Sequence, residues 1–158
     1  MSVLHNLYEF DNPRLFVGLG PLPVSHALKL KSLERALPTA RWQALPDYHL
    51  TLRFVGNVEH RVADDLLQAL QTVRFEPFDL TIQGVDTFHK NGHPKIVWAG
   101  VEDSKPLRTL QAQVAEVVEK ATGHPSENHF NPHITLARVK EDSVPLRSFL
   151  SEYKGFKL

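Results

Sequence analysis

Two similar heptapeptides decide how this sequence is interpreted: His49-Leu-Thr-Leu-Arg-Phe-Val55 and His133-Ile-Thr-Leu-Ala-Arg-Val139. They align without a gap, and the His, Thr, Leu and Val of the first each recur in the second. They are separated by about half of the 158-residue chain, which is the spacing that a duplicated α+β half would leave behind. The repeat therefore predicts two similar lobes, each contributing one His-x-Thr strand.

The residue types in the repeat suit phosphodiester chemistry. Successive side chains of a strand point to opposite faces, so His49 and Thr51 share one face, as do His133 and Thr135. Two imidazoles that titrate near neutrality can supply a base to the nucleophile and an acid to the leaving oxygen. Threonine hydroxyls can donate to the non-bridging oxygens. We therefore expect His49 and His133 to be catalytic, Thr51 and Thr135 to bind phosphate, and no metal to be bound.

The pairing of the two motifs carries this interpretation. With nine histidines in the chain, roughly 0.1 His-x-Thr tetrapeptides with apolar residues at both x positions are expected by chance. A single such motif would be interpreted as an ordinary strand, because threonine favours strands. Two aligned copies indicate one shared site. The residues alone leave open which histidine is the acid and which is the base.

Composition narrows the class of protein. A chain of 158 residues is the size of one domain, and no apolar run is long enough to cross a bilayer. The 18 basic residues equal the 18 acidic ones, so any nucleic acid must be bound locally rather than by a global positive field. There is no cysteine, and no secretory signal is visible at the start. We expect a monomer that acts in the cytoplasm.

Periodicity predicts alternating strands and helices. Predicted strands cover residues 14–19, 48–55, 78–85, 95–101 and 133–139. Predicted helices cover residues 24–37, 60–73, 107–122 and 145–153. Residues 86–94 are interpreted as a polar connection in which Asn91-Gly92 favours a hairpin turn. The pattern favours an α+β fold.

Several other residues could belong to a site. Arg53 shares the face of His49 and Thr51 by alternation, so a contact to phosphate or ribose is predicted. The histidines outside the motifs stand mostly in turns without a carboxylate at a metal-ligand spacing, which argues against a metal centre; they are His89, His93, His124 and His129. Three aromatic residues could stack an RNA base, but packing is the better interpretation; they are Trp42, Phe54 and Phe130. Parity puts Phe54 on the apolar face of its strand.

The sequence resembles the 2H phosphoesterase superfamily, which is named for two His-x-Thr-x motifs, and within it the RNA 2′,3′-cyclic phosphodiesterases, also called 2′-5′ RNA ligases. The likeness covers roughly residues 14–150. It rests on four stretches: 14–19, 48–58, 94–100 and 130–138. Residues 1–12 precede the usual start and form an N-terminal extension to a single bilobal domain.

The resemblance implies both a fold and an activity. It implies pseudo-duplicated antiparallel sheets with outer helices around a concave cleft. It also implies hydrolysis of an RNA terminal 2′,3′-cyclic phosphate to a 2′-phosphomonoester, with His49 as proton donor to the leaving 3′-oxygen and His133 as base toward water. The implied partner is an RNA 3′ end or a nucleotide that carries the cyclic phosphate, and no cofactor is implied.

Arg138 matches a family position linked to phosphate contact. Strict alternation, however, puts Arg138 on the face opposite His133 and Thr135, so a β-bulge or strand end is needed to bring it in. Two further enzymatic interpretations stay open, namely cyclic phosphodiesterase activity on a nucleotide-sized substrate and reversible 2′-5′ RNA ligation. A noncatalytic module that binds nucleotides or RNA ends is a third, although binding alone needs no acid and base pair.

Overall fold

The structure is a computed structural model that describes residues 2–3, 12–126 and 129–158. Most of the expected N-terminal extension, residues 1 and 4–11, lies outside the described residues. The chain divides into two compact units, each built from three separate segments. In the described part of the chain, no helix is both long and apolar enough to cross a membrane.

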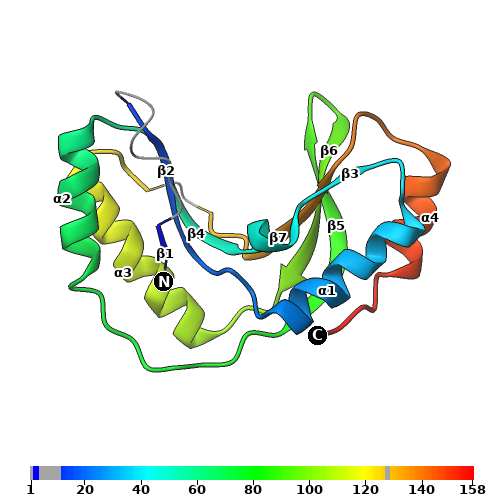
Figure 1. The fold of residues 1–158 in the computed structure, drawn as a ribbon, viewed down its shortest axis with the longest axis horizontal. Helices are drawn as coiled ribbons and strands as arrows, with labels where there is room; N and C mark the ends of the chain where they lie inside the picture. Colours follow the sequence, from blue (N-terminus) through cyan, green and yellow to red (C-terminus); the bar gives the residue numbers. More distant parts are fainter. Residues whose placement is uncertain (1, 4–11, 127–128) are drawn as a thin grey trace. The chain divides into compact units, whose positions relative to one another are not determined.

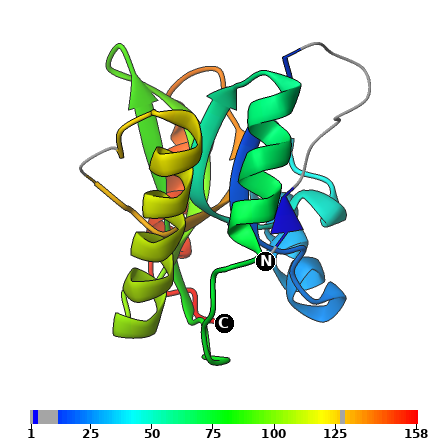
Figure 2. The same ribbon diagram turned by 90° about the vertical axis from the view of Figure 1, so that its left-hand side faces the viewer.

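Unit 1 comprises residues 1–19, 51–79 and 103–131. It contains β1 (Ser2–Val3), β2 (Arg14–Leu19), most of β4 (Leu50–Asn57), α2 (His60–Leu70) and α3 (Lys105–Thr122). The strands lie in the order β1-β2-β4, and α2 and α3 pack together on one face of them (Figures 1 and 2). The helical spacing predicted for α3 places one apolar stripe in the core, formed by Leu107, Leu110, Val114 and Val118.

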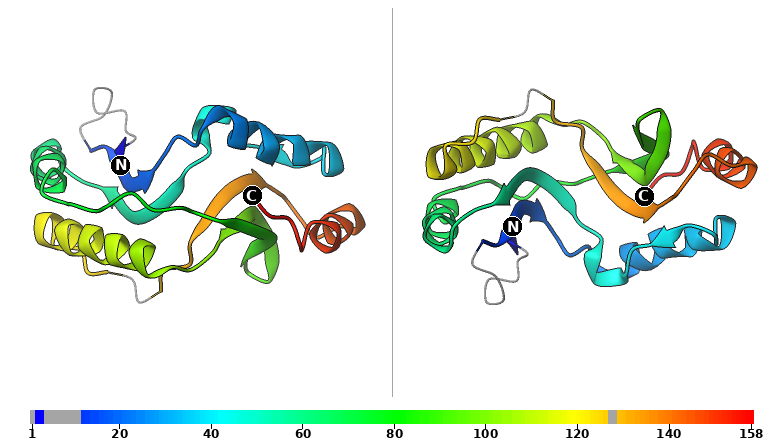
Figure 3. Two further views of the ribbon diagram at one scale, coloured as in Figure 1. Left: turned by 90° about the horizontal axis from the view of Figure 1, so that it is seen from below. Right: turned by 90° about the horizontal axis from the view of Figure 1, so that it is seen from above.

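Unit 2 comprises residues 20–50, 80–102 and 132–158. It contains α1 (Val24–Ser32), η1 (Leu33–Ala36), β3 (Arg41–Trp42), η2 (Leu45–Asp47), β5 (Ile82–Lys90), β6 (His93–Val101), β7 (His133–Arg138) and α4 (Val144–Glu152). Antiparallel pairing joins β5 to β6, β6 to β7, and β7 to β3. Figure 3 shows α1 and α4 on the same side of these strands. Between helices and strands lies a core that includes Leu30, Leu37, Tyr48, Val97, Ile134, Leu136, Leu146 and Phe149.

The hairpin of unit 2 is longer than the sequence led us to expect. β5 and β6 run to Lys90 and His93, so the predicted polar connection is mostly strand, and Asn91-Gly92 alone forms the turn. Both turn residues have positive φ, 53° at Asn91 and 76° at Gly92. Such a turn matches the twist of the strands and lets them continue to its edge. Polar side chains in 86–94 were a poor guide because both hairpin strands have exposed positions there.

The other predicted elements are confirmed with shifted ends. The helix from residue 24 becomes 3₁₀ after Ser32, and the helix from residue 60 ends at Leu70. The two-residue strand β3 was not predicted, because two residues are too few to show a period. The α+β class and the antiparallel pairing expected for its sheets are confirmed in unit 2.

Candidate active site

The burial of the two motifs follows the predicted alternation. Leu50, Leu52, Ile134 and Leu136 are all at most 2 % exposed, whereas the histidines and threonines between them are half-buried. The apolar side chains therefore anchor each strand from the core, and the polar side chains are presented on the other face.

The two motifs meet in a single strand pairing. Leu50, the first residue of β4, pairs antiparallel with Ile134 of β7, and both belong to unit 2. The same register sets His49 opposite Thr135, a position at which side chains of adjacent strands approach closely. His133 follows two residues along the same face of β7. Both histidines belong to unit 2, and Thr51 is the first residue of β4 that belongs to unit 1. The assignment of one motif to each predicted lobe stays a prediction.

His49 is held by its backbone surroundings. Its Nδ1 lies 2.6 Å from the carbonyl oxygen of Asp47, and because a carbonyl only accepts, Nδ1 carries the proton and donates. Nε2 is then the ring nitrogen that can exchange a proton with a substrate. Gly20 packs against the same residue, since a Cβ added to Gly20 would lie 2.7 Å from the Cβ of His49. A glycine is therefore required where the chain passes His49.

His133 is held by aromatic rings. Its imidazole meets the ring of Phe88 edge-on, with centroids 4.7 Å apart and an interplanar angle of 86°. The ring centroid of Trp98 lies 5.9 Å from that of the imidazole and 5.0 Å from that of Phe88. In the sheet, Trp98 pairs with Thr135, and Gly100 pairs with His133. The two aromatic residues thus flank His133 on the presented face of β5 and β6.

A β-bulge brings Arg138 onto this face. Between Val97 and Trp98 β6 advances one residue, while β7 advances two, from Ala137 to Thr135. The side-chain alternation of β7 therefore slips at this point: Leu136 and Ala137 are both buried, and Arg138 is exposed. Arg138 consequently shares the face of His133 and Thr135, as the bulge alternative required.

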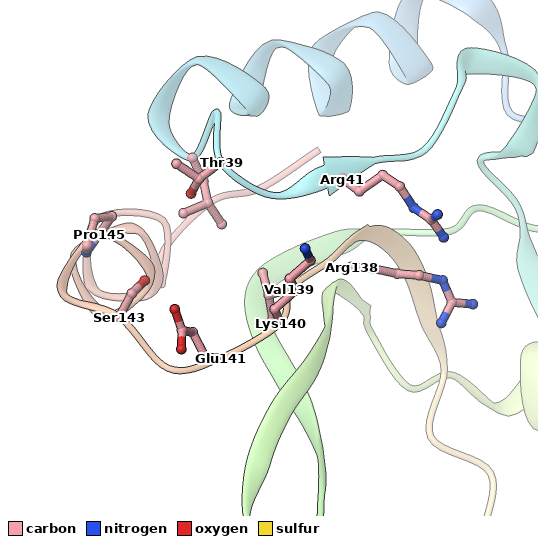
Figure 4. Close-up of a pocket in the computed structure, with 9 residues that line it drawn as sticks. Thr39, Arg41, Arg138, Val139, Lys140, Glu141, Ser143 and Pro145 are labelled. Carbon is pink, nitrogen blue, oxygen red and sulfur yellow. The ribbon is translucent and has the colours of Figure 1, made fainter.

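A second arginine stands beside Arg138. Arg41 of β3 pairs directly with Arg138 of β7, and both are exposed. Figure 4 shows the two guanidinium groups extending in the same direction. They border a cavity of about 490 Å³ that Lys140, Glu141 and Ser143 also line. Arg41 was missed because β3 is too short to reveal a face.

Arg53 has structural partners within unit 1. Its guanidinium donates to the carbonyl oxygens of Pro125, at 2.8 Å, and His124, at 3.2 Å, and also to that of Phe54. These bonds tie β4 to the segment that follows α3. The predicted phosphate contact of Arg53 would have to be made in addition to them.

Tyr48 adjoins the first motif from inside the core. Its side chain is fully buried, and its hydroxyl has no hydrogen-bond partner among the described residues. Burial, together with the negative charge of Glu34, raises the pKa of Tyr48 to about 12. The phenol therefore stays neutral at physiological pH and acts as packing behind His49.

The predicted roles of the aromatic residues are confirmed in one case and wrong in another. Trp42 is buried, with Nε1 donating to the carbonyl of Leu37 at 2.8 Å. Phe54 is 60 % exposed and its ring contacts Phe16 at 6.3 Å, so the expected position on the apolar face is wrong. The burial pattern of β4 slips by one residue there, because Val55 rather than Phe54 is buried. Phe130 is half-buried.

Phe88 and Trp98 are further residues that the sequence reasoning missed. Phe88 fell within the predicted connection, and Trp98 was noted only as part of a strand. The signal was present, since Val97, Ala99 and Val101 alternate with Trp98 and Gly100 and are the buried set. Among residues 2–3, 12–126 and 129–158, no three His, Asp or Glu side chains are grouped so that they could hold a metal ion.

Comparisons with family models and with known proteins agree on one family for this chain. A family model described as the 2′-5′ RNA ligase superfamily matches residues 22–156. Two relatives named RNA 2′,3′-cyclic phosphodiesterase come from Aeropyrum pernix, 35 % identical over 60 % of this chain, and Thermus thermophilus, 32 % identical over 92 %. The chain spans 80 % of the Thermus relative but 54 % of the Aeropyrum relative. It spans 60 % of the like-named protein of Archaeoglobus fulgidus.

Solved structures agree in fold. A crystal structure of a Thermus thermophilus protein matches with a TM-score of 0.68 and 28 % identity, over 82 % of this chain and 76 % of the other. Escherichia coli LigT in complex with 3′-AMP matches with a TM-score of 0.73 over 84 % of this chain and 76 % of LigT. At 24 % identity, the likeness to LigT concerns the fold alone.

Proposed function

The chain belongs to the 2′-5′ RNA ligase superfamily, and we propose that it hydrolyses the terminal 2′,3′-cyclic phosphate of RNA to a 2′-phosphomonoester. One observation carries the proposal: the pairing of Leu50 with Ile134, whose register sets His49 opposite Thr135 with His133 on the same face of β7. Two imidazoles on one small surface suit one phosphorus atom. The names of the relatives from Aeropyrum and Thermus support the same reaction.

Each of the two histidines carries out one proton transfer of the proposed reaction. His133 takes a proton from water as the water oxygen bonds to phosphorus. The bond from phosphorus to the 3′-oxygen breaks, and His49 gives its Nε2 proton to that oxygen, so the phosphate stays on the 2′-oxygen. The hydrogen bond from Nδ1 of His49 to Asp47 fixes the ring with Nε2 available for this step. The assignment of acid and base follows the family resemblance.

The threonines and Arg138 bind the substrate in this proposal. The hydroxyl of Thr135, opposite His49, donates to a non-bridging oxygen and offsets the charge that builds up in the transition state. Thr51 takes the equivalent role from its place in the first motif. Arg138, brought to the same face by the β-bulge, binds the phosphate backbone. Arg53 stays a sequence prediction, because its guanidinium already donates to the carbonyls of residues 54, 124 and 125.

The proposed mechanism assigns no step to a metal ion, a cofactor or a second subunit. The proton transfers run through imidazole, and the phosphate is met by hydroxyl and guanidinium donors. The monomeric state and the cytoplasmic location also stay predictions from the sequence.

The test is product analysis. The protein is incubated in excess chelator with an oligonucleotide that ends in a 2′,3′-cyclic phosphate, and in parallel with a nucleoside 2′,3′-cyclic phosphate. We expect a 2′-phosphomonoester from the oligonucleotide and undiminished turnover after chelation. A 3′-phosphomonoester, or activity that disappears with chelator and returns with metal, would contradict the mechanism. Turnover of the nucleoside substrate alone would favour a nucleotide-sized substrate, and binding without turnover of either would favour a noncatalytic module.

A further inference from the structure

β5 contains a β-bulge near its beginning. From Ile82 to Val85 the strand advances three residues, while the paired residues of β6 advance only two. Gly84, inside the bulge, has a φ of 70°, which lies in the left-handed region that glycine adopts without a steric penalty. Bulged residues are left out of the ladder with the neighbouring strand. Other contacts must therefore hold Gln83 and Gly84 in place.

The carbonyl group of Gln83 lies over Gly100 of β6. A Cβ added to Gly100 would lie 2.6 Å from this carbonyl oxygen and 3.5 Å from Cζ3 of Trp98. Because residues two apart on a strand share a face, this Cβ would point to the presented face, like the side chain of Trp98. Gly100 is also the residue that pairs with His133 of β7. The bulge of β5 therefore reaches the backbone position opposite His133, where the close carbonyl leaves room only for glycine.

Residues 156–158 form a C-terminal segment that holds the bulge from the outer edge of β5 (Figure 1). The N–H of Ile82 donates to the carbonyl of Leu158 at 2.7 Å, and the N–H of Leu158 donates to the carbonyl of Ile82 at 2.8 Å. The N–H of Gly84 donates to the carbonyl of Phe156 at 2.7 Å. These three hydrogen bonds fix the bulge along the edge of the sheet.

The main chain rather than a side chain carries this attachment. The Nζ of Lys157 lies 3.5 Å from Oε1 of Glu102, and such an exposed ion pair contributes little to stability because water screens it. The backbone of Lys157 forms a β-bridge with Gln83. The carbonyl oxygen of Lys154 also passes close by, 3.1 Å from a Cβ added to Gly84. The C-terminal segment therefore acts on β5 through its backbone.

We infer that the C-terminal segment positions His133 and that it acts through Gln83 and Gly100. Its hydrogen bonds fix the bulge, the bulge carbonyl sets how closely β5 and β6 approach at Gly100, and Gly100 sets the backbone of its partner on β7. The inference rests on the proposed function, in which His133 is the base, and adds the residues that place this base. A segment that only covered the edge of β5 would affect stability but not the imidazole.

Gly100→Ala tests the contact beside His133 directly. The added methyl group must displace a backbone carbonyl, which moves less freely than the end of a side chain. A displacement of about 1 Å can lower a rate up to 10²-fold, so we expect kcat to fall at least tenfold and KM to change less than about threefold. The imidazole ¹⁵N signals of His133 should shift, while those of His49 stay unchanged. Unchanged kcat with unchanged His133 signals would overturn the role of Gly100.

Gly84→Ala tests the bulge, and Gly92→Ala is its matched control. Both glycines belong to the β5–β6 hairpin and have positive φ, 70° and 76°, so both substitutions strain the backbone to a similar degree. No described atom lies within 4 Å of a Cβ added to Gly92. We expect similar losses of thermal stability, but shifted His133 signals and a fall of kcat by about threefold to tenfold in Gly84→Ala alone. Equal effects of the two variants on kcat and on the His133 signals would overturn the role of the bulge.

Leu158→Pro tests the C-terminal segment, because proline lacks the N–H that donates to Ile82. Glu102→Gln is the control, since it removes the exposed ion pair and leaves the three backbone hydrogen bonds. We expect kcat to fall about two- to fivefold in Leu158→Pro, with the His133 signals shifted in the same direction as in Gly84→Ala, and no change of either in the control. Lower thermal stability of Leu158→Pro with unchanged kcat and His133 signals would overturn the inference.

The NMR signals separate this inference from the proposed function. A wild-type protein that does not hydrolyse the cyclic phosphate would contradict the proposed function, and the His133 signals, which need no turnover, would still decide whether the C-terminal segment positions the imidazole. If Gly100→Ala does not fold, the comparison of Gly84→Ala with Gly92→Ala decides the same question.

Discussion

The two His-x-Thr motifs carry the same residues but are held in different ways. His49 stands just before β4 and depends on backbone contacts, namely the carbonyl of Asp47 and the close passage of Gly20. His133 lies at the start of β7 and depends on the rings of Phe88 and Trp98. A duplicated motif can therefore present the same side chain while its two supports diverge. Different supports suit the opposite proton transfers that we propose for the two histidines.

The largest expected effect comes from removing either histidine. His49→Ala and His133→Ala should each lower kcat/KM on the cyclic phosphate about 10³-fold. A nucleoside phosphodiester with a 4-nitrophenyl leaving group separates their roles, because that leaving group needs no proton. On this substrate the loss in His49→Ala should shrink to less than about tenfold, while the loss in His133→Ala persists. The assigned roles would be contradicted if the 4-nitrophenyl substrate restored the activity of both variants, or that of His133→Ala alone.

Gly20→Ala tests the backbone support of His49. The added methyl group has no room beside the Cβ of His49, so the ring must shift, and a shift of about 1 Å can lower the rate up to 10²-fold. We expect kcat to fall at least tenfold, with the His133 NMR signals unchanged. Gly155→Ala is the matched control, because no atom lies within 4 Å of a Cβ added there. Unchanged kcat in Gly20→Ala would show that this contact does not position His49.

Phe88→Leu tests the aromatic support of His133. Loss of an aromatic contact is worth about 0.5–1.5 kcal/mol, so kcat should fall about two- to tenfold, with a smaller change in KM. The imidazole NMR signals of His133 should move, and those of His49 should not. Phe78→Leu, whose ring packs on Phe75, serves as control. A loss of thermal stability with unchanged kcat would show that Phe88 contributes to core packing but does not position His133.

The smallest effect concerns the core behind His49. The pKa of Tyr48 is raised from 10.0 to about 12, so the folded state holds this proton more tightly than the unfolded chain. The associated stability is complete below pH 10 and is lost as the pH rises from 10 to 12. The free energy of unfolding of Tyr48→Phe should therefore fall less than that of the wild type over that pH interval. At neutral pH, the substitution should change it by about 1 kcal/mol or less. Parallel alkaline unfolding curves for the variant and wild type would contradict this, and Tyr153→Phe is the control.

The sequence predicted the alternating burial of the two motifs better than it predicted the residues that support their histidines. His-x-Thr alternation correctly separated the presented residues from Leu50, Leu52, Ile134 and Leu136, because a period of two is visible within four residues. At Arg138, a period of two assigns the wrong face of the strand. A bulge at Leu136 reversed its face, and bulges depend on pairing between strands that are distant in sequence.

Residues in short or misassigned segments were beyond sequence reasoning. Arg41 lies in a strand of two residues, and Phe88 lies in a segment whose polar neighbours suggested a loop. The close passage of Gly20 past His49 joins residues that are far apart in the sequence. The boundary between the two units falls inside the first motif, between Leu50 and Thr51.

One titration tests most directly whether the two motifs form one site. The imidazole ¹⁵N signals of the protein are followed as adenosine 2′-monophosphate, a product analogue, is added. We predict that the Nε2 signals of His49 and His133 shift together along one saturation curve with a single Kd, and that either histidine-to-alanine variant weakens the response of the remaining histidine. A shift of one histidine alone, or two curves with different Kd values, would contradict a shared phosphate site.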